Sequence, residues 1–102
     1  MCGFVGIIKH KERVLVDKGL RALETIKHRG PDATGHWTDC KRFFLGHNRL
    51  SIIDLSEAAN QPFFSPCGQV AIVYNGEVYN FRNLRTQLGP HTLRTQSDTE
   101  VI

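Results

Sequence analysis

Short runs of β-type residues, bounded by proline, glycine and asparagine, alternate in this chain with segments of helical periodicity. This alternation constrains the fold more than any other feature, because the runs are rich in β-branched and aromatic residues and end at turn formers. It predicts an α+β domain with several short strands. The runs read CGFVGIIK at the N-terminus, followed by GHWT, RFFLGHNRLSIIDL and QVAIVYN.

Segments with helical periodicity lie between and after these runs. Apolar residues recur at spacings of three and four from about Val14 to His28, which predicts an amphipathic helix. The segment NFRNLRTQL predicts a shorter helix, and HTLRT predicts a strand. Ser97 and Glu100 form a capping box that predicts the start of a last helix. So short a helix is marginal alone, so we expect the chain to be a fragment of a longer protein.

Composition and length exclude several classes of protein. The 102 residues hold at most one domain, and 40% hydrophobic and 23% charged residues are ordinary for a globular protein. The net charge of +3 comes from scattered lysines and arginines, so no nucleic-acid partner is expected. Without a long apolar stretch or a secretory signal, no membrane association is expected, and the cytoplasm is the expected location. Three cysteines without a C-x-x-C pair predict neither a disulfide framework nor a metal site.

Cys2 follows the initiator methionine and leads the first apolar run. If Met1 is removed, the thiol and a free α-amino group belong to the same residue. An α-amino group is partly unprotonated near neutral pH and can accept the thiol proton, so a nucleophile and its base would arrive together. A buried cysteine at the start of a strand is nevertheless the more common arrangement. Both interpretations stay open on position alone.

Asn75 and Gly76 lie between two β-type runs in the segment VYNGEVY. Asn-Gly is the strongest short signal for a β-hairpin, so a hairpin turn is predicted here. A tight turn also exposes backbone N–H groups, and the Asn75 amide beside the Gly76 N–H would make a donor pair suited to an oxyanion. The two interpretations are compatible.

Three charged residues suggest a site for an amino acid. Arg49 interrupts an apolar run, where a guanidinium needs a carboxylate partner such as the α-carboxylate of a substrate. Asp98 stands at the start of the last predicted helix, where the helix dipole alone would favour it. Together with Glu77 it could instead receive a substrate ammonium group. A site that binds and hydrolyses an amino acid of this kind needs a cation, one or two anions, an oxyanion hole and a nucleophile.

Six segments of the chain, in their order and spacing, resemble a known family. They read MCGFVGI, HRGPDATG, LGHNRLSIIDL, NQPF, VYNGEVYN and SDTEVI. Over its whole length the chain resembles the N-terminal glutaminase domain of glutamine-hydrolysing asparagine synthetases, which are class II glutamine amidotransferases. Other members of this class share the N-terminal Cys-Gly, whereas HRGPD and RLSIIDL are similar to the asparagine synthetase branch.

The resemblance implies a fold and a set of site residues. The fold is the α+β sandwich of N-terminal-nucleophile hydrolases, an αββα arrangement of two antiparallel sheets between helix layers, which residues 1–102 would hold only in part. Cys2 would be the nucleophile, with Asn75 and Gly76 as the oxyanion hole. The glutamine-binding residues would be Arg49, Leu50, Ser51, Ile52, Ile53, Asn75, Gly76, Glu77 and Asp98.

The implied activity is hydrolysis of glutamine to glutamate and ammonia through a thioester on Cys2. In the whole protein, which could form a homodimer, the ammonia would pass to a C-terminal synthetase domain that uses ATP and Mg²⁺ to amidate aspartate to asparagine. That domain and the rest of the glutaminase domain would lie outside residues 1–102, within which no cofactor is expected. Two alternatives stay open: a related amidotransferase with another acceptor, and a non-catalytic α/β module in which Cys2 is a core residue.

Overall fold

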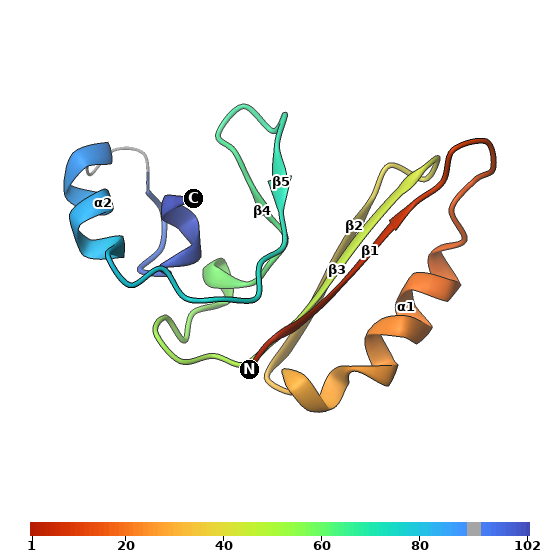
Figure 1. Ribbon diagram of the computed structural model, residues 1–102, viewed down its shortest axis with the longest axis horizontal. Coiled ribbons are helices and arrows are strands. Elements are labelled where there is room, and N and C mark those ends of the chain that lie inside the picture. The colour runs from red at the N-terminus through yellow and green to blue at the C-terminus, as the bar shows by residue number, and fades with distance from the viewer. Residues whose placement is uncertain (90–92) are drawn as a thin grey trace.

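Residues 1–49 form an antiparallel sheet with one helix against it, and we call this part the sheet half (Figure 1). The computed structural model describes residues 1–89 and 93–102. The central strand β3 pairs along its length with β1 on one side and β2 on the other. The elements are β1 (Gly3–Ile8), α1 (Val16–Thr25), the 3₁₀ turn η1 (Lys27–Arg29), β2 (Ala33–Thr38) and β3 (Phe43–Arg49).

The core of the sheet half lies between α1 and one face of the sheet. Val14, Leu23 and Phe44 are buried there. Helix and sheet approach closely because two glycines face large side chains: a Cβ on Gly19 or on Gly46 would lie 2.5 Å from Phe44 or Leu23, respectively. Apolar burial of this kind is the main stabilising contribution in a small domain.

The rest of the described chain, residues 50–89 and 93–102, has much less regular structure, and we call it the loop half. Its two strands pair over only two residues each. In Figure 1 it lies beside the sheet half, and Trp37 of β2 contacts Phe64 of β4 edge to face with ring centroids 6.1 Å apart. The elements are the 3₁₀ turn η2 (Glu57–Ala59), β4 (Phe63–Phe64), β5 (Ala71–Ile72), α2 (Phe81–Leu88) and the 3₁₀ turn η3 (Thr99–Val101).

The α+β prediction is confirmed. Two helices and two small antiparallel sheets agree with an incomplete αββα sandwich. The strand predicted in CGFVGIIK forms β1, and the periodicity between Val14 and His28 forms α1 with the turn η1. The segment NFRNLRTQL forms α2.

Two predicted strands end earlier than expected. The run RFFLGHNRLSIIDL is a strand only to Arg49. The Arg49 carbonyl accepts the N–H of Asp32 at 3.0 Å, and the N–H of Ser51 donates to the Asp32 carboxylate at 2.8 Å, because β2 begins only at residue 33 and no partner strand remains. Similarly, QVAIVYN pairs only at Ala71–Ile72.

The predicted hairpin at Asn75 and Gly76 is wrong. No strand follows β5 in the described chain before α2, so these residues lie in an irregular segment. Residues 91 and 92 of the predicted strand HTLRT lie outside the described residues, and 93–95 form no strand.

The predicted capping box is half formed. The Ser97 hydroxyl accepts the N–H of Thr99 at 3.2 Å, but the Glu100 carboxylate accepts the N–H groups of Arg94 and Thr95 at 2.7 Å instead of that of Ser97. The helix that follows is a single 3₁₀ turn.

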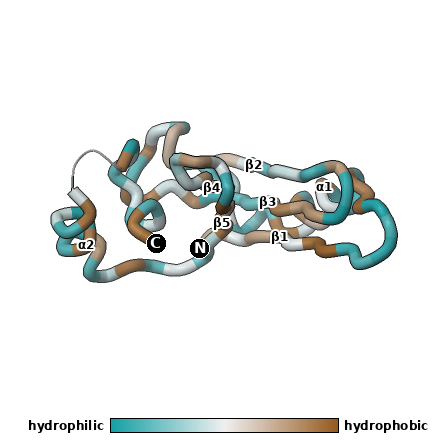
Figure 2. The backbone as a smooth tube through the Cα atoms, turned by 90° about the horizontal axis from the view of Figure 1, so that it is seen from above, coloured by the Kyte–Doolittle hydropathy of each residue, from teal (hydrophilic) through white to brown (hydrophobic). Residues whose placement is uncertain are grey.

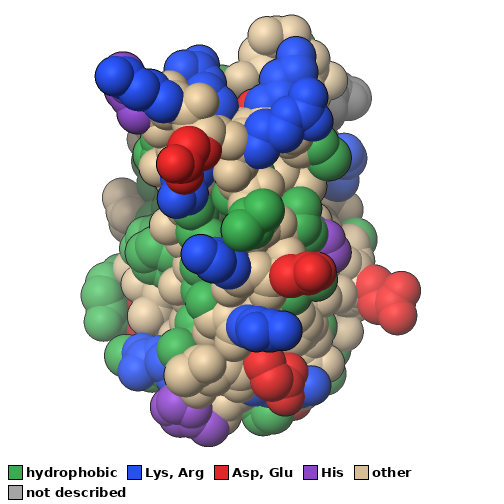
Figure 3. Space-filling model, turned by 90° about the vertical axis from the view of Figure 1, so that its right-hand side faces the viewer, with side chains coloured by type: hydrophobic (Ala, Val, Ile, Leu, Met, Phe, Trp, Pro, Cys, Tyr) green, Lys and Arg blue, Asp and Glu red, His purple; other side chains and the backbone are tan. Residues whose placement is uncertain are grey.

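The surface of the sheet half is mixed in character. In Figure 2 the loop between β1 and α1 is hydrophilic, in contrast to the hydrophobic end of β1 beside it. Lys and Arg side chains are interspersed with Asp and Glu on the face shown in Figure 3. Within residues 1–89 and 93–102, neither α1 nor α2 has the length and apolar character that a membrane span requires.

Candidate active site

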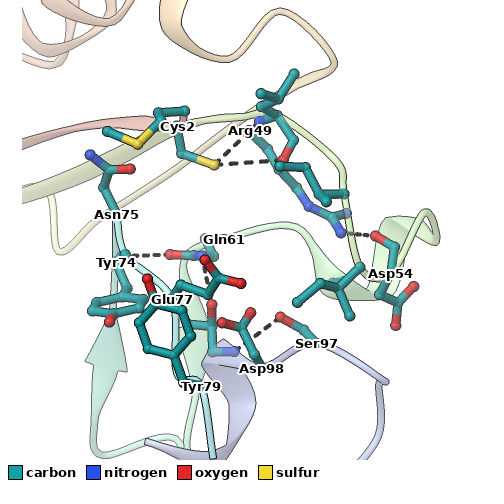
Figure 4. Close-up of a pocket in the computed structure, with 17 residues that line it drawn as sticks. Cys2, Arg49, Asp54, Gln61, Tyr74, Asn75, Glu77, Tyr79, Ser97 and Asp98 are labelled. Carbon is teal, nitrogen blue, oxygen red and sulfur yellow. Dashed lines mark hydrogen bonds between the residues drawn. The ribbon is translucent and has the colours of Figure 1, made fainter. Parts of the chain in front are cut away.

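A cavity of about 400 Å³ opens where the sheet half meets the loop half (Figure 4). It brings together the predicted site residues with one exception. Ser51 does not line it, because its backbone is turned to Asp32. The predicted residues in the wall are Cys2, Arg49, Leu50, Ile52, Ile53, Asn75, Gly76, Glu77 and Asp98.

The pairing of β1 with β3 places Cys2 in this wall. Gly3 lies opposite Asn48, so Cys2 comes beside the residues that follow β3. The N–H of Leu50 points at the Cys2 sulfur over 3.3 Å, and the Leu50 carbonyl lies 3.7 Å from the same sulfur. The Cys2 carbonyl accepts the Nε–H of Arg29 at 3.0 Å. The main chain of Cys2 is therefore held by Arg29 of the sheet half, and its thiol lies against Leu50, the first residue of the loop half.

Alternation along β3 brings Arg49 to the same cavity. Phe44 and Gly46 of β3 face α1, so His47 and Arg49 project from the opposite face. Arg49 is only 7% exposed.

Arg49 meets no carboxylate within the described residues, so the carboxylate partner predicted for it would have to come from a substrate. It donates to the carbonyl oxygens of Asp54 and Ser56, the latter at 2.8 Å, and to the side-chain oxygen of Asn60 at 2.9 Å. These neutral oxygens satisfy N–H groups but leave the net positive charge in place. The cavity wall therefore presents a buried cation to any carboxylate that enters.

The segment that carries Asn75 and Gly76 lines the cavity beside Cys2. Figure 4 shows Asn75 and Cys2 on the same side of the cavity. The ring of Tyr74 lies so close to Gly76 that a Cβ there would collide with its hydroxyl group. Only glycine therefore fits at this position without a shift of the ring.

Two carboxylates lie together in the cavity, apart from the Cys2 thiol (Figure 4). Glu77 is exposed, whereas Asp98 is only 8% exposed. One Asp98 oxygen accepts the N–H of Val78 at 2.9 Å, so this carboxylate also fixes the backbone that follows Glu77. With Arg49 the two acids give the cavity a cation and an anionic pair, the complement of a zwitterionic amino acid.

Comparison with known proteins identifies the family. All residues from 1 to 102 match the model of the glutamine amidotransferase domain. The chain belongs to that family. It is 39% identical over 107 residues to a glutamine-hydrolysing asparagine synthetase of Triphysaria versicolor and 40% identical over 107 residues to that of Sandersonia aurantiaca. It is also 37% identical over 115 residues to the amidase chry2 of Gibberella zeae.

These relatives are much longer than the chain. Each alignment covers 100% of the chain but only 17% to 19% of the relative. The family resemblance stated from the motifs is thus confirmed, and the amidotransferase domain is related to the N-terminal part of asparagine synthetases.

Sequence reasoning missed three residues of the amidotransferase domain that shape its cavity. Gln61 accepts the N–H of Tyr74 at 2.6 Å, and His47 contacts the Tyr74 carbonyl through Nε2 at 3.1 Å. Gln61 belongs to the NQPF segment of the family resemblance, which was a usable signal without a role attached. For His47 and Tyr74 no local pattern indicated a contact, because they lie 27 residues apart.

The loop that follows β3 is anchored at its far side by Asp54. The Asp54 carboxylate accepts the N–H groups of Ser56 at 2.8 Å and Gln96 at 2.7 Å. Hydrogen bonds from Ser56 and then Gln96 hold the pKa of Asp54 below its ordinary value. The amidotransferase cavity thus has a wall that is tied to the sheet half through Asp32 and to the C-terminal turn through Asp54.

Proposed function

We propose that this amidotransferase domain hydrolyses glutamine through Cys2 and that the released ammonia serves the synthesis of asparagine. The observation that carries the proposal is the single cavity in which the Cys2 thiol and the Asn75–Gly76 segment lie with buried Arg49 and the acids Glu77 and Asp98. Arg49 would bind the glutamine α-carboxylate, and the two acids its α-ammonium group. Glutamine held in this way extends its side-chain amide toward the thiol.

The reaction requires a base at Cys2. Met1 is 77% exposed and can be removed, which would leave the α-amino group of Cys2 free. This amine would take the thiol proton, and the thiolate would attack the amide carbon of the glutamine side chain. The negative charge that develops on the amide oxygen would be stabilised by the Asn75 side-chain amide and the Gly76 N–H.

The tetrahedral intermediate would then release ammonia. The carbon–nitrogen bond breaks, and the proton held by the Cys2 amine goes to the leaving nitrogen. The γ-glutamyl thioester on Cys2 is hydrolysed by water, with the amine again accepting a proton, to glutamate and the free thiol. No metal takes part in these steps.

The use of the ammonia is proposed from the relatives that are named asparagine synthetases. In the full-length protein a further domain would use ATP and Mg²⁺ to amidate aspartate, and we expect this activity in the cytoplasm. A second candidate is an amidotransferase with another acceptor, which the amidase among the relatives favours. Supplying ammonia, aspartate and ATP to the full-length protein separates the two, because asparagine forms only in the first.

The nucleophile is tested by Cys2→Ala in the full-length protein. Glutamine hydrolysis should be abolished while ammonia-dependent synthesis is retained. Cys67→Ala, which changes an exposed cysteine, is the matched control and should keep both activities. Intact-mass analysis of the active enzyme should show that Met1 is absent. Retained glutaminase activity in Cys2→Ala, or an active enzyme that keeps Met1, would refute the proposed mechanism.

A further inference from the structure

The candidate oxyanion donors lie in a segment without regular backbone pairing. The β5 ladder ends at Ile72, and α2 begins at Phe81. In a strand or helix the backbone hydrogen bonds fix where each N–H points. Between these elements the direction of the Gly76 N–H and of the Asn75 side chain has to be set by other contacts.

The peptide groups on both sides of Tyr74 supply such contacts, immediately before Asn75. The Tyr74 N–H donates to Oε1 of Gln61 at 2.6 Å (Figure 4), and the Tyr74 carbonyl lies 3.1 Å from Nε2 of His47. Because a carbonyl oxygen can only accept, Nε2 of His47 carries the proton. Gln61 is 7% exposed and His47 is fully buried, so water does not compete readily for either bond.

Both partners of Tyr74 are themselves held by the sheet half. His47 belongs to the central strand β3, which is paired on both sides. The carbonyl of Gln61 lies so close to Gly35 of β2 that a Cβ on Gly35 would collide with it. The Gln61 amide nitrogen also faces the Thr99 hydroxyl at 3.4 Å. These contacts fix the position of Tyr74 relative to the sheet whose first strand follows Cys2.

We propose that Gln61 and His47 are positioning residues that bind the main chain of Tyr74 from both sides and so aim the donors of Asn75 and Gly76 at the position of the oxyanion beside the Cys2 thiol. This inference rests on the proposed glutaminase function. An oxyanion hole acts through donors that are oriented before the reaction, and a misplacement of about 1 Å can cost about 10² in rate. His47 does not line the cavity, and Gln61, which does, has its Oε1 bound to the Tyr74 N–H, so we expect the loss of either side chain to act on kcat.

The experiment compares variants of the full-length protein. Gln61→Met removes the acceptor of the Tyr74 N–H at similar volume, and His47→Met removes the donor to the Tyr74 carbonyl. Each should lower kcat for glutamine hydrolysis by about 10-fold to 10²-fold, with KM changed by less than about threefold. His47→Gln keeps an N–H donor at a similar reach and should recover most of kcat. Gln69→Met, in the exposed turn between β4 and β5, is the matched control and should behave as wild type.

Two further readouts separate aiming from general damage. Alkylation of Cys2 by iodoacetamide needs no oxyanion donor, so its rate should be unchanged in Gln61→Met and His47→Met. Amide hydrogen exchange at Tyr74 should be faster in Gln61→Met, because the N–H has lost its acceptor. A fall in alkylation rate that parallels kcat, or a failure of His47→Gln to recover activity, would overturn the proposal.

The outcomes also distinguish this inference from the function beneath it. If wild-type protein hydrolyses glutamine and Gln61→Met keeps full kcat, the aiming role is wrong and the function stands. If wild-type protein does not hydrolyse glutamine, the proposed function is wrong, but hydrogen exchange at the Tyr74 amide still tests whether Gln61 holds the Tyr74 main chain. Faster exchange in Gln61→Met supports that contact, and unchanged exchange refutes it.

Discussion

The sheet half and the loop half are held together in different ways. In the sheet half, main-chain groups pair with one another along β1, β3 and β2, and a buried core lies beneath α1. In the loop half, side chains take over much of this pairing: the carboxylates of Asp54, Asp98 and Glu100 and the amide of Gln61 accept main-chain N–H groups.

The two halves also contribute different residues to the cavity. The sheet half holds Cys2 and Arg49, whereas the loop half contributes the donors and acids that face them. Changes in the sheet core should therefore act mainly on stability, and changes in the loop half mainly on catalysis. Four predictions test this division, in order of decreasing expected effect.

Phe44→Ala should have the largest effect. Phe44 is fully buried between α1 and the sheet, and removing so large a side chain leaves a cavity that costs about 3–5 kcal/mol of unfolding free energy. Denaturation of the full-length protein, with hydrogen exchange read at the amides of β3, measures the loss. Phe43→Ala, at a neighbouring residue that is 37% exposed, is the control and should cost much less. Equal losses in the two variants would show that the sheet core does not carry the stability.

Asn75→Ala should act on catalysis rather than on stability. Losing one oxyanion donor lowers kcat by about 10²–10³, equivalent to about 2.7–4 kcal/mol in the barrier. Steady-state glutamine hydrolysis by the full-length protein measures this, beside Asn83→Ala on the exposed side of α2. An effect confined to KM would contradict the role of Asn75.

Arg49→Lys should weaken substrate binding across the boundary between the halves. A lysine ammonium cannot present two parallel N–H groups to a carboxylate, so KM for glutamine should rise by about tenfold to hundredfold. The matched control is Arg42→Lys in the exposed turn between β2 and β3. If KM is unchanged, the substrate carboxylate binds elsewhere.

The smallest expected effect is on the pH dependence of stability. Burial lowers the pKa of His47 below its ordinary 6.5, so the unfolded chain takes up a proton before the folded protein does. This contribution to stability is complete above about pH 6.5 and is lost as the pH falls from there toward the folded pKa, by at most about 1.4 kcal/mol per pH unit. His47→Gln should remove this slope between pH 6.5 and the folded pKa in denaturation experiments. His10→Gln controls for changing an exposed histidine, and an unaltered slope in His47→Gln would count against the buried neutral ring.

Local patterns predicted the sheet half well. The apolar run after Cys2 and the spacing of three and four after Val14 follow from the backbone geometry of a strand and of a helix, so both can be recognised in the sequence. The family motifs also predicted the cavity, in which Ser51 alone of the predicted residues does not line the wall. Each motif is a short continuous segment that contains the cavity residues, so it can be recognised without knowledge of the fold.

The loop half shows where such reasoning ends. Asn75-Gly76 has the composition of a hairpin turn, yet the Tyr74 N–H meets Gln61, 13 residues away, instead of a partner strand. Likewise, the sequence predicted a carboxylate partner for Arg49, such as that of a substrate, but not the carbonyl groups of the following loop to which Arg49 donates. In both cases the hydrogen-bond partner is the group that the fold brings within reach.

The sequence by itself determined the class of fold, the first strand, the two helices and the family to which the chain belongs. Only the tertiary structure decided where β3 ends, which groups satisfy Arg49 and what holds Asn75 and Gly76 beside Cys2. The physical reason is that periodicity reports local backbone geometry and the face a residue presents. A main-chain N–H or a guanidinium, by contrast, takes the acceptor that folding brings nearest, and that acceptor can lie anywhere along the chain.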